Sequence, residues 1–147
     1  MPSTYDPLLR LELQATGENA TTWGTKTNNN LDLIAAAVAG IATVSVSSGD
    51  TTLSTANALP DQARCGILLV QGTLTGNANI IMPASPKTYI FIRQTSGAFD
   101  ITAKQSAGSG TVLPPSGPAL IINTSTTSID LMAGLLDNYG VRITETI

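Results

Sequence analysis

The side chains available for chemistry in this sequence are ten carboxylates and a single thiol, because the chain contains no histidine. Without an imidazole, a serine or cysteine nucleophile lacks its most common activating base, and the most common nitrogen ligand for metals is missing. Cys65 is the only cysteine, so an intrachain disulfide and a cysteine metal cluster are both excluded. It adjoins the apolar run 66–70, and we interpret it as a buried structural thiol.

The carboxylates form no catalytic pattern. A glycosidase pair needs two carboxyl groups about 5–10 Å apart across the sugar, and no motif brings together the aspartates near the expected strand ends: Asp50, Asp61, Asp100 and Asp130. Asp is common in turns, and we assign these residues to turns and surface. The glycine-rich piece 108–110 lacks the lysine and helix of a phosphate-binding loop. The sequence predicts no enzyme, no cofactor and no metal site.

Charge is sparse in this chain. Charged residues make up 12 % of the sequence, against about 25 % in ordinary soluble domains. The seven Lys and Arg residues stand singly and the net charge is −3, which argues against a nucleic-acid partner and against a polybasic contact with a membrane. A weakly charged surface is explained if it is buried against other copies or a larger assembly. A β-protein coated with Thr and Ser is the alternative.

Residues 1–22 are expected to form an extended anchoring arm. Pro2 and Pro7 discourage a helix, and a short apolar strip needs a neighbouring surface to cover it: Leu8, Leu9, Leu11 and Leu13. The start of the chain has no basic and apolar signal pattern, and the longest apolar run, 33–38, is too short to span a bilayer. We therefore expect the chain to be made and kept in a cytoplasm until assembly or lysis.

The periodicity of apolar residues predicts a helix over 23–40, with Gly40 as a left-handed C-cap. Its start is open between Thr22 and the Asn triplet 28–30 as N-cap. A helix this short is marginal in water, so its apolar face must dock on something. We predict that this stripe is the oligomerisation surface: Trp23, Thr27, Asn30, Leu31, Ile34 and Val38.

Asn30 has two interpretations. If the helix runs back to Trp23, Asn30 falls near the apolar stripe, where a ring of amides between copies would fix register and oligomer number. Alternatively the Asn residues cap the helix and face water.

From residue 41 the pattern changes to the alternation typical of strands. Strands are expected at 42–47, 51–53, 66–71, 79–82, 88–94, 99–104, 119–123 and 128–132, separated by turn-rich segments. Their spacing favours a mainly β fold in which residues 41–134 form a compact antiparallel β-sandwich or barrel. Residues 135–147 are expected to be a C-terminal strand or tail, because 138–144 alternates again.

Several of these segments carry a family resemblance. The run Leu11–Thr25, with Ala15-Thr16-Gly17-Glu18-Asn19 and Thr22-Trp23-Gly24, leads into Asn28-Asn29-Asn30-Leu31-Asp32-Leu33-Ile34. Together with 73–83, 89–102 and the loop Val112-Leu113-Pro114, it resembles a recurrent module of fibre-like virion proteins of tailed bacteriophages. The similarity covers about residues 8 to 133.

The resemblance implies a trimeric, elongated and non-catalytic part of the virion. We expect a short homotrimeric tail fibre or fibre adaptor whose partners are its own copies and tail or baseplate proteins. A capsid decoration, cement or head-fibre protein bound to the major capsid protein is the alternative. A carbohydrate-binding module ranks last, because the β-part offers few aromatic residues: Tyr89, Phe91 and Phe99.

Overall fold

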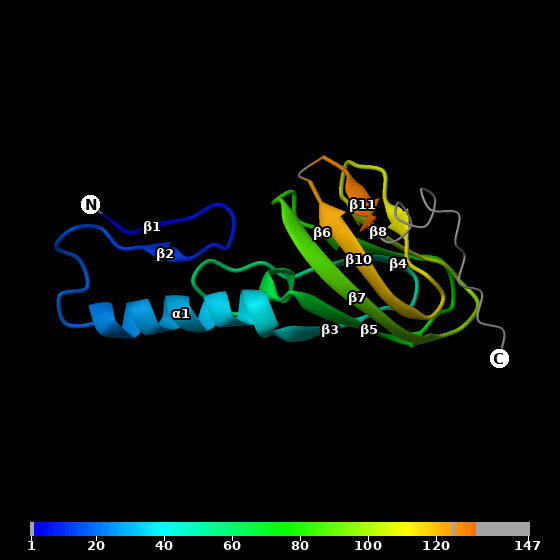
Figure 1. Ribbon diagram of the computed structural model, residues 1–147, viewed down its shortest axis with the longest axis horizontal. Helices are drawn as coiled ribbons and strands as arrows, with labels where there is room; N and C mark the ends of the chain where they lie inside the picture. Colours follow the sequence, from blue (N-terminus) through cyan, green and yellow to red (C-terminus); the bar gives the residue numbers. More distant parts are fainter. Residues whose placement is uncertain (1, 125, 132–147) are drawn as a thin grey trace.

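The computed structural model describes residues 2–124 and 126–131. A hairpin and a helix project from a two-layered β-domain (Figure 1). The elements in chain order are β1 (Thr4–Tyr5), β2 (Glu12–Leu13), α1 (Trp23–Ala39), β3 (Ile41–Ser45), β4 (Gly49–Thr52), the 3-10 helix η1 (Gln62–Arg64), β5 (Ile67–Thr73), β6 (Ala78–Met82), β7 (Lys87–Ser96), β8 (Ile101–Gln105), β9 (Thr111–Val112), β10 (Gly117–Asn123) and β11 (Ser128–Asp130).

The N-terminal arm is a hairpin rather than the extended segment that we expected. β1 and β2 pair antiparallel, with Tyr5 opposite Glu12. Asp6 closes the turn between them, because its carboxylate accepts hydrogen bonds from the backbone N–H groups of Leu8 and Leu11 at 2.9 and 2.8 Å. This local turn reverses the chain, so the arm lies along its own helix (Figure 1).

The predicted helix is confirmed, since α1 spans Trp23–Ala39. The left-handed cap at Gly40 is wrong: this residue is extended, with φ −74° and ψ 145°. Glycine is needed there for space, because a Cβ atom would overlap the carbonyl oxygen of Ala36. The chain thus passes from helix to β3 without a loop, and α1 and β3 are directly coupled.

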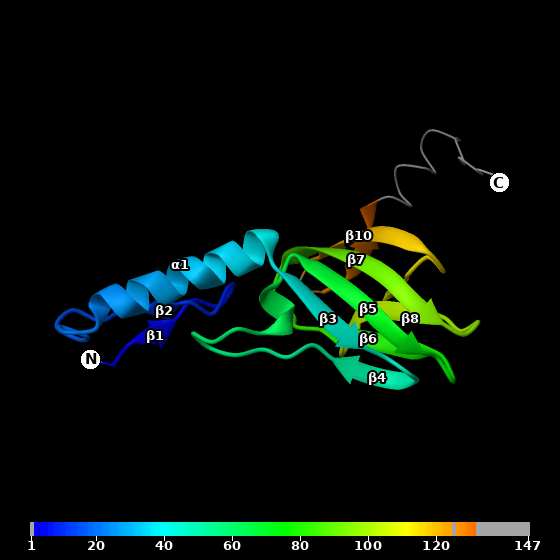
Figure 2. The same ribbon diagram turned by 90° about the horizontal axis from the view of Figure 1, so that it is seen from below.

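From β3 to β8 the chain alternates between two facing sheets (Figure 2). The odd-numbered strands β3, β5 and β7 pair parallel in one sheet, and β4, β6 and β8 pair parallel in the other. Each circuit adds one strand to each sheet, as in a short β-solenoid. Antiparallel strands complete both sheets, which have the orders β11-β10-β7-β5-β3 and β4-β6-β8-β9.

The mainly β fold is confirmed, but the predicted antiparallel pairing is wrong for the strands from β3 to β8, and the described strands close no barrel. Alternating hydrophobicity identifies the buried face of a strand and contains no information about its neighbour. Parallel neighbours need a crossover, which is usually a helix. Here a strand of the opposite sheet provides it.

The expected strand positions are confirmed with small shifts at their ends, and β9 was missed because two residues cannot show an alternation. The predicted tail 135–147 lies outside the described residues.

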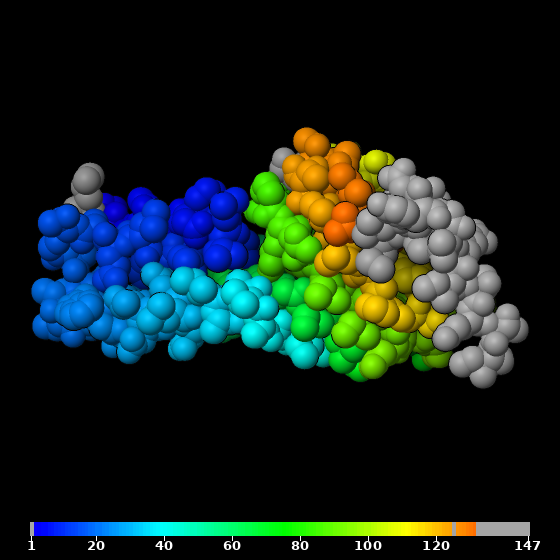
Figure 3. Space-filling model, viewed as in Figure 1, coloured from blue at the N-terminus to red at the C-terminus, as the bar shows by residue number. Residues whose placement is uncertain are grey.

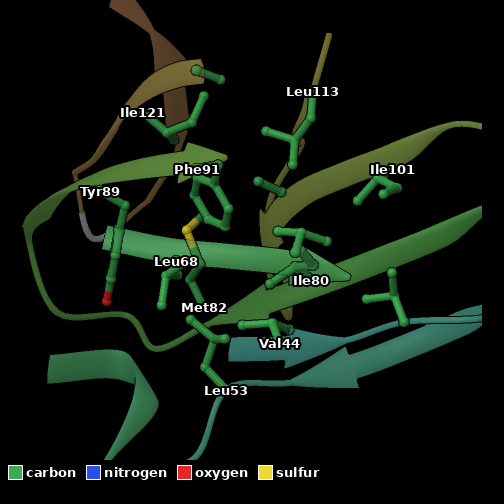
Figure 4. Close-up of a cluster of buried hydrophobic side chains, with 14 of the residues drawn as sticks. Val44, Leu53, Leu68, Ile80, Met82, Tyr89, Phe91, Ile101, Leu113 and Ile121 are labelled. Carbon is green, nitrogen blue, oxygen red and sulfur yellow. The ribbon is translucent and has the colours of Figure 1, made fainter. Parts of the chain in front are cut away.

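The core lies between the two sheets and is built from the inward residues of both (Figure 4). Leu68, Phe91 and Ala119 form one aligned row across three strands of the larger sheet. They face Ile80 and Ile101 of the smaller sheet within the same cluster. Phe91 is 1 % exposed, so this contact between the layers excludes water.

Phe91→Ala should lower the free energy of unfolding by about 3–5 kcal/mol, because it removes a buried ring and leaves a cavity. Phe99→Ala is the matched control, since Phe99 is 40 % exposed, and it should cost about 1 kcal/mol or less. Urea unfolding followed by circular dichroism measures both. Equal losses would contradict the placement of the core.

Candidate assembly site

One side of α1, next to the residues that contact the hairpin, is apolar and exposed. Trp23, Leu31 and Val38 are 62 %, 58 % and 78 % exposed, and Ile34 is also exposed. Leu33, on the opposite side of the helix, is the buried residue of α1. Four of the six predicted oligomerisation residues therefore lie on one open surface, which we call the helix stripe: Trp23, Leu31, Ile34 and Val38.

The other two predicted residues, Thr27 and Asn30, contact the arm. The Asn30 side chain accepts a hydrogen bond from the Glu12 N–H at 3.1 Å and donates one to the Glu12 carbonyl at 2.8 Å. Thr27 accepts a longer bond from the Gln14 amide at 3.4 Å. Asn30 lies inside the helix, so it does not cap it. Because its amide is engaged on both sides within the chain, we omit Asn30 from the proposed interface.

Charge also fixes the arm against α1. The carboxylate of Glu12 lies 3.0 Å from the Lys26 ammonium, and this hydrogen bond to Lys26 lowers the pKa of Glu12. Burial would raise the pKa of Asp6, but the hydrogen bonds that its carboxylate accepts from backbone N–H groups outweigh burial and lower the pKa. Both acids are therefore stabilised as anions in the folded arm.

The four predicted anchoring residues divide into two pairs. Leu8 and Leu13 are 54 % and 52 % exposed, so they are available to another molecule. Leu9 and Leu11 are partly buried, and the Leu9 carbonyl accepts a hydrogen bond from Arg64 Nε at 2.9 Å.

A buried charge cluster joins the arm to the β-domain. The Asp61 side chain is 1 % exposed and lies 2.9 Å from the Arg10 guanidinium and 3.2 Å from that of Arg64. It also accepts hydrogen bonds from the N–H groups of Ala56 and Arg64, at 2.9 and 2.7 Å. Since Arg10 belongs to the arm and Asp61 to the loop before β5, these contacts hold the two parts in one orientation.

Lys87 ties the same loop to the larger sheet. Its ammonium donates to the carbonyls of Ala63 and Cys65, at 3.1 and 2.9 Å, and to that of Arg64. Burial lowers the pKa of Lys87 to about 8. The Tyr89 hydroxyl donates to the Ala63 carbonyl at 2.9 Å, and burial raises the pKa of Tyr89 to about 12. Sequence reasoning missed this network, because its cations are isolated along the chain.

The remaining polar residues in the described part of the chain form no metal-binding cluster. No group of at least three His, Cys, Asp or Glu side chains within 2–124 and 126–131 could hold a metal ion. Asp50 accepts a hydrogen bond from Asn79 at 2.7 Å, as expected for a surface residue. Cys65 is half-buried rather than buried, and it packs against the core. None of the described helices is long and apolar enough to cross a bilayer.

No family model, curated protein or solved structure matches this chain. The helix stripe and the exposed arm leucines, Leu8 and Leu13, are the exposed apolar features of the arm and helix.

Asp61→Asn should destabilise the protein by about 3 kcal/mol or more, because it leaves two guanidinium groups without their anion in a buried site. Asp50→Asn, at an exposed position, should change stability by about 0.5 kcal/mol or less. Thermal and urea unfolding of both variants provide the comparison. Equal stability of Asp61→Asn and the wild type would show that the cluster does not hold the arm.

Proposed function

We propose that this chain is a non-enzymatic structural component of a tailed-phage virion, a short homotrimeric tail fibre or fibre adaptor attached through its N-terminal arm. The observation that carries the proposal is the helix stripe. A projecting helix that exposes Leu31, Ile34 and Val38 to water is an incomplete structure. The sequence resemblance to virion fibre modules supports the same conclusion.

The residue types of the stripe favour more than two copies. Leu31, Ile34 and Val38 follow one another at intervals of three and four residues, which are successive a, d and a positions of a heptad. Leucine at position a with isoleucine at position d shifts coiled coils from two strands toward three or four. Burying each such side chain contributes about 1.5–3 kcal/mol, before the entropic cost of association.

The arm is suited to attachment. Its hairpin lies at the end of the molecule away from most of the β-domain (Figure 1), and it exposes Leu8 and Leu13. Asp61, Asn30 and Lys26 hold it in place, so it is preorganised, and preorganisation reduces the entropic cost of binding. We propose that these leucines contact a tail or baseplate protein.

The carbohydrate-binding alternative loses most of its aromatic candidates. Tyr89 and Phe91 are each 1 % exposed and belong to the core, so neither can form a platform for a sugar ring.

Val38→Asp should convert the trimer into a monomer, because threefold packing would bring three unpaired carboxylates together at one seam. Thr25→Asp is the control, since Thr25 is exposed on the same helix and lies off the stripe. Light scattering on a sizing column measures the mass of each variant. A Val38→Asp protein that keeps the trimer mass would remove α1 as the assembly element.

The double change Leu8→Glu and Leu13→Glu should leave the fold and the trimer intact and reduce incorporation into particles at least tenfold, because charge replaces the exposed apolar contacts. Val112→Glu, similarly exposed but in the β-domain, should be incorporated normally. Quantitative mass spectrometry of purified particles measures incorporation and also copy number. Tens of copies would favour the tail, whereas hundreds would favour the capsid. Normal incorporation of the double variant would place the attachment elsewhere.

A further inference from the structure

The larger sheet has a second apolar surface on its side away from the core. Side chains alternate along a strand, so in β7 the buried Tyr89 and Phe91 leave Ile90 and Ile92 on the outside. The register aligns Ile90 with Ile67 of β5 and with Leu120 of β10. A row of branched apolar side chains therefore crosses the outside of the sheet.

We call this surface the outer sheet face. By register and alternation it comprises Ile41, Thr43, Ser45, Ile67, Leu69, Gln71, Thr88, Ile90, Ile92, Gln94, Pro118, Leu120, Ile122 and Ile129. None of these residues is charged.

The outside of the smaller sheet has a different character. Asp50 pairs there with Asn79, and their row continues to Thr102. Lys104 lies on the same side together with two apolar residues, the buried Ile81 and the exposed Val112. These polar and charged side chains are those of a surface in contact with water. Among the described residues, the outer sheet face is therefore the more apolar of the two outsides, and it carries no charge.

The outer sheet face continues the helix stripe. Ile41 follows Val38 after three residues, the next step of the heptad, and it is 64 % exposed as the first residue of β3. In Figure 2 the hairpin lies below α1, and the smaller sheet likewise lies below the larger sheet. The side of α1 turned away from the hairpin and the outer sheet face therefore look in the same direction, and the helix stripe lies along the edge of that side. Figure 3 shows the molecule in the orientation in which the larger sheet lies in front.

We propose that the outer sheet face is buried against a second copy of this chain, as one continuous interface with the helix stripe. This inference rests on the proposed trimer and extends its interface from the helix to the β-domain. An uncharged face offers no partner to a charged surface, whereas another copy presents the same uncharged, apolar face. Helix stripe and sheet face together approach the roughly 20–30 residues a side of a standard interface.

The arrangement has a consequence for the shape of the assembly. Burying the stripe and the sheet face in the same oligomer requires the copies to run parallel, with three larger sheets facing a common axis. All arms then lie at one end, and all β-domains project at the other. The polar outsides of the smaller sheets face water.

The test is the solution mass of Ile90→Asp, measured by light scattering alongside the wild type and a control. Val112→Asp is the matched control, because Val112 is exposed on the outside of the smaller sheet. We expect the trimer mass for the wild type and Val112→Asp, and the monomer mass for Ile90→Asp. Ile90 is 39 % exposed, so an aspartate there can reach water in the monomer. Ile129→Asp, on the edge strand β11, tests a second point of the face with less demand on folding.

Emission of Trp23, the single tryptophan, gives an independent readout, since it lies on the helix stripe. Dissociation by Ile90→Asp should shift this emission to the red, although the substitution is in another element.

The outcomes separate this inference from the proposed trimer. If Ile90→Asp and Ile129→Asp both keep the trimer mass while Val38→Asp becomes a monomer, the sheet face is not an interface and the helix-based trimer stands. If Val112→Asp also dissociates, the effect does not map to the outer sheet face, and the inference is wrong. A monomeric wild type would overturn both proposals.

Discussion

A buried carboxylate between two guanidinium groups is costly to break, because any single loss leaves a charge without water and without a partner. Asp61 is such a group, with a distant partner in the sequence, Arg10 in the arm, and a near one, Arg64 at the end of η1. Lys87 extends the same polar network into β7 by donating to the carbonyls around η1. The orientation of the arm and of α1 relative to the sheets depends on this cluster. Any use of the arm for attachment relies on it in turn.

The winding of the chain produces two sheets with one shared inner side and two unlike outer sides. Parallel pairing stacks equivalent positions of successive circuits, so a residue type repeated in the sequence becomes a continuous row in the sheet. In the larger sheet this row is isoleucine, and it faces outward. Charged residues make up only 12 % of the chain, and the outer sheet face and the helix stripe contain no charged residue. The proposed parallel trimer would remove both surfaces from water and keep the polar sides exposed.

The proposed function is inferred from apolar surfaces that are exposed to water. Two groups with shifted pKa values, Lys87 and Tyr89, donate hydrogen bonds to backbone carbonyls. Their role is to hold the loop before β5. The apolar surfaces without partners are instead on the outside, where association can cover them.

The sequence by itself determined the local features. Helical periodicity marked α1, and alternation marked the strands. These properties depend on neighbours within a few residues, which composition and spacing record. Only the tertiary structure decided that the arm folds back, that the strands from β3 to β8 pair parallel, and that Asn30 binds Glu12. It also brought Arg10 to Asp61, and aligned Ile41, Ile67 and Ile90 on one face. Such contacts join positions widely separated in the chain, and the energy of each depends on burial that no local pattern contains.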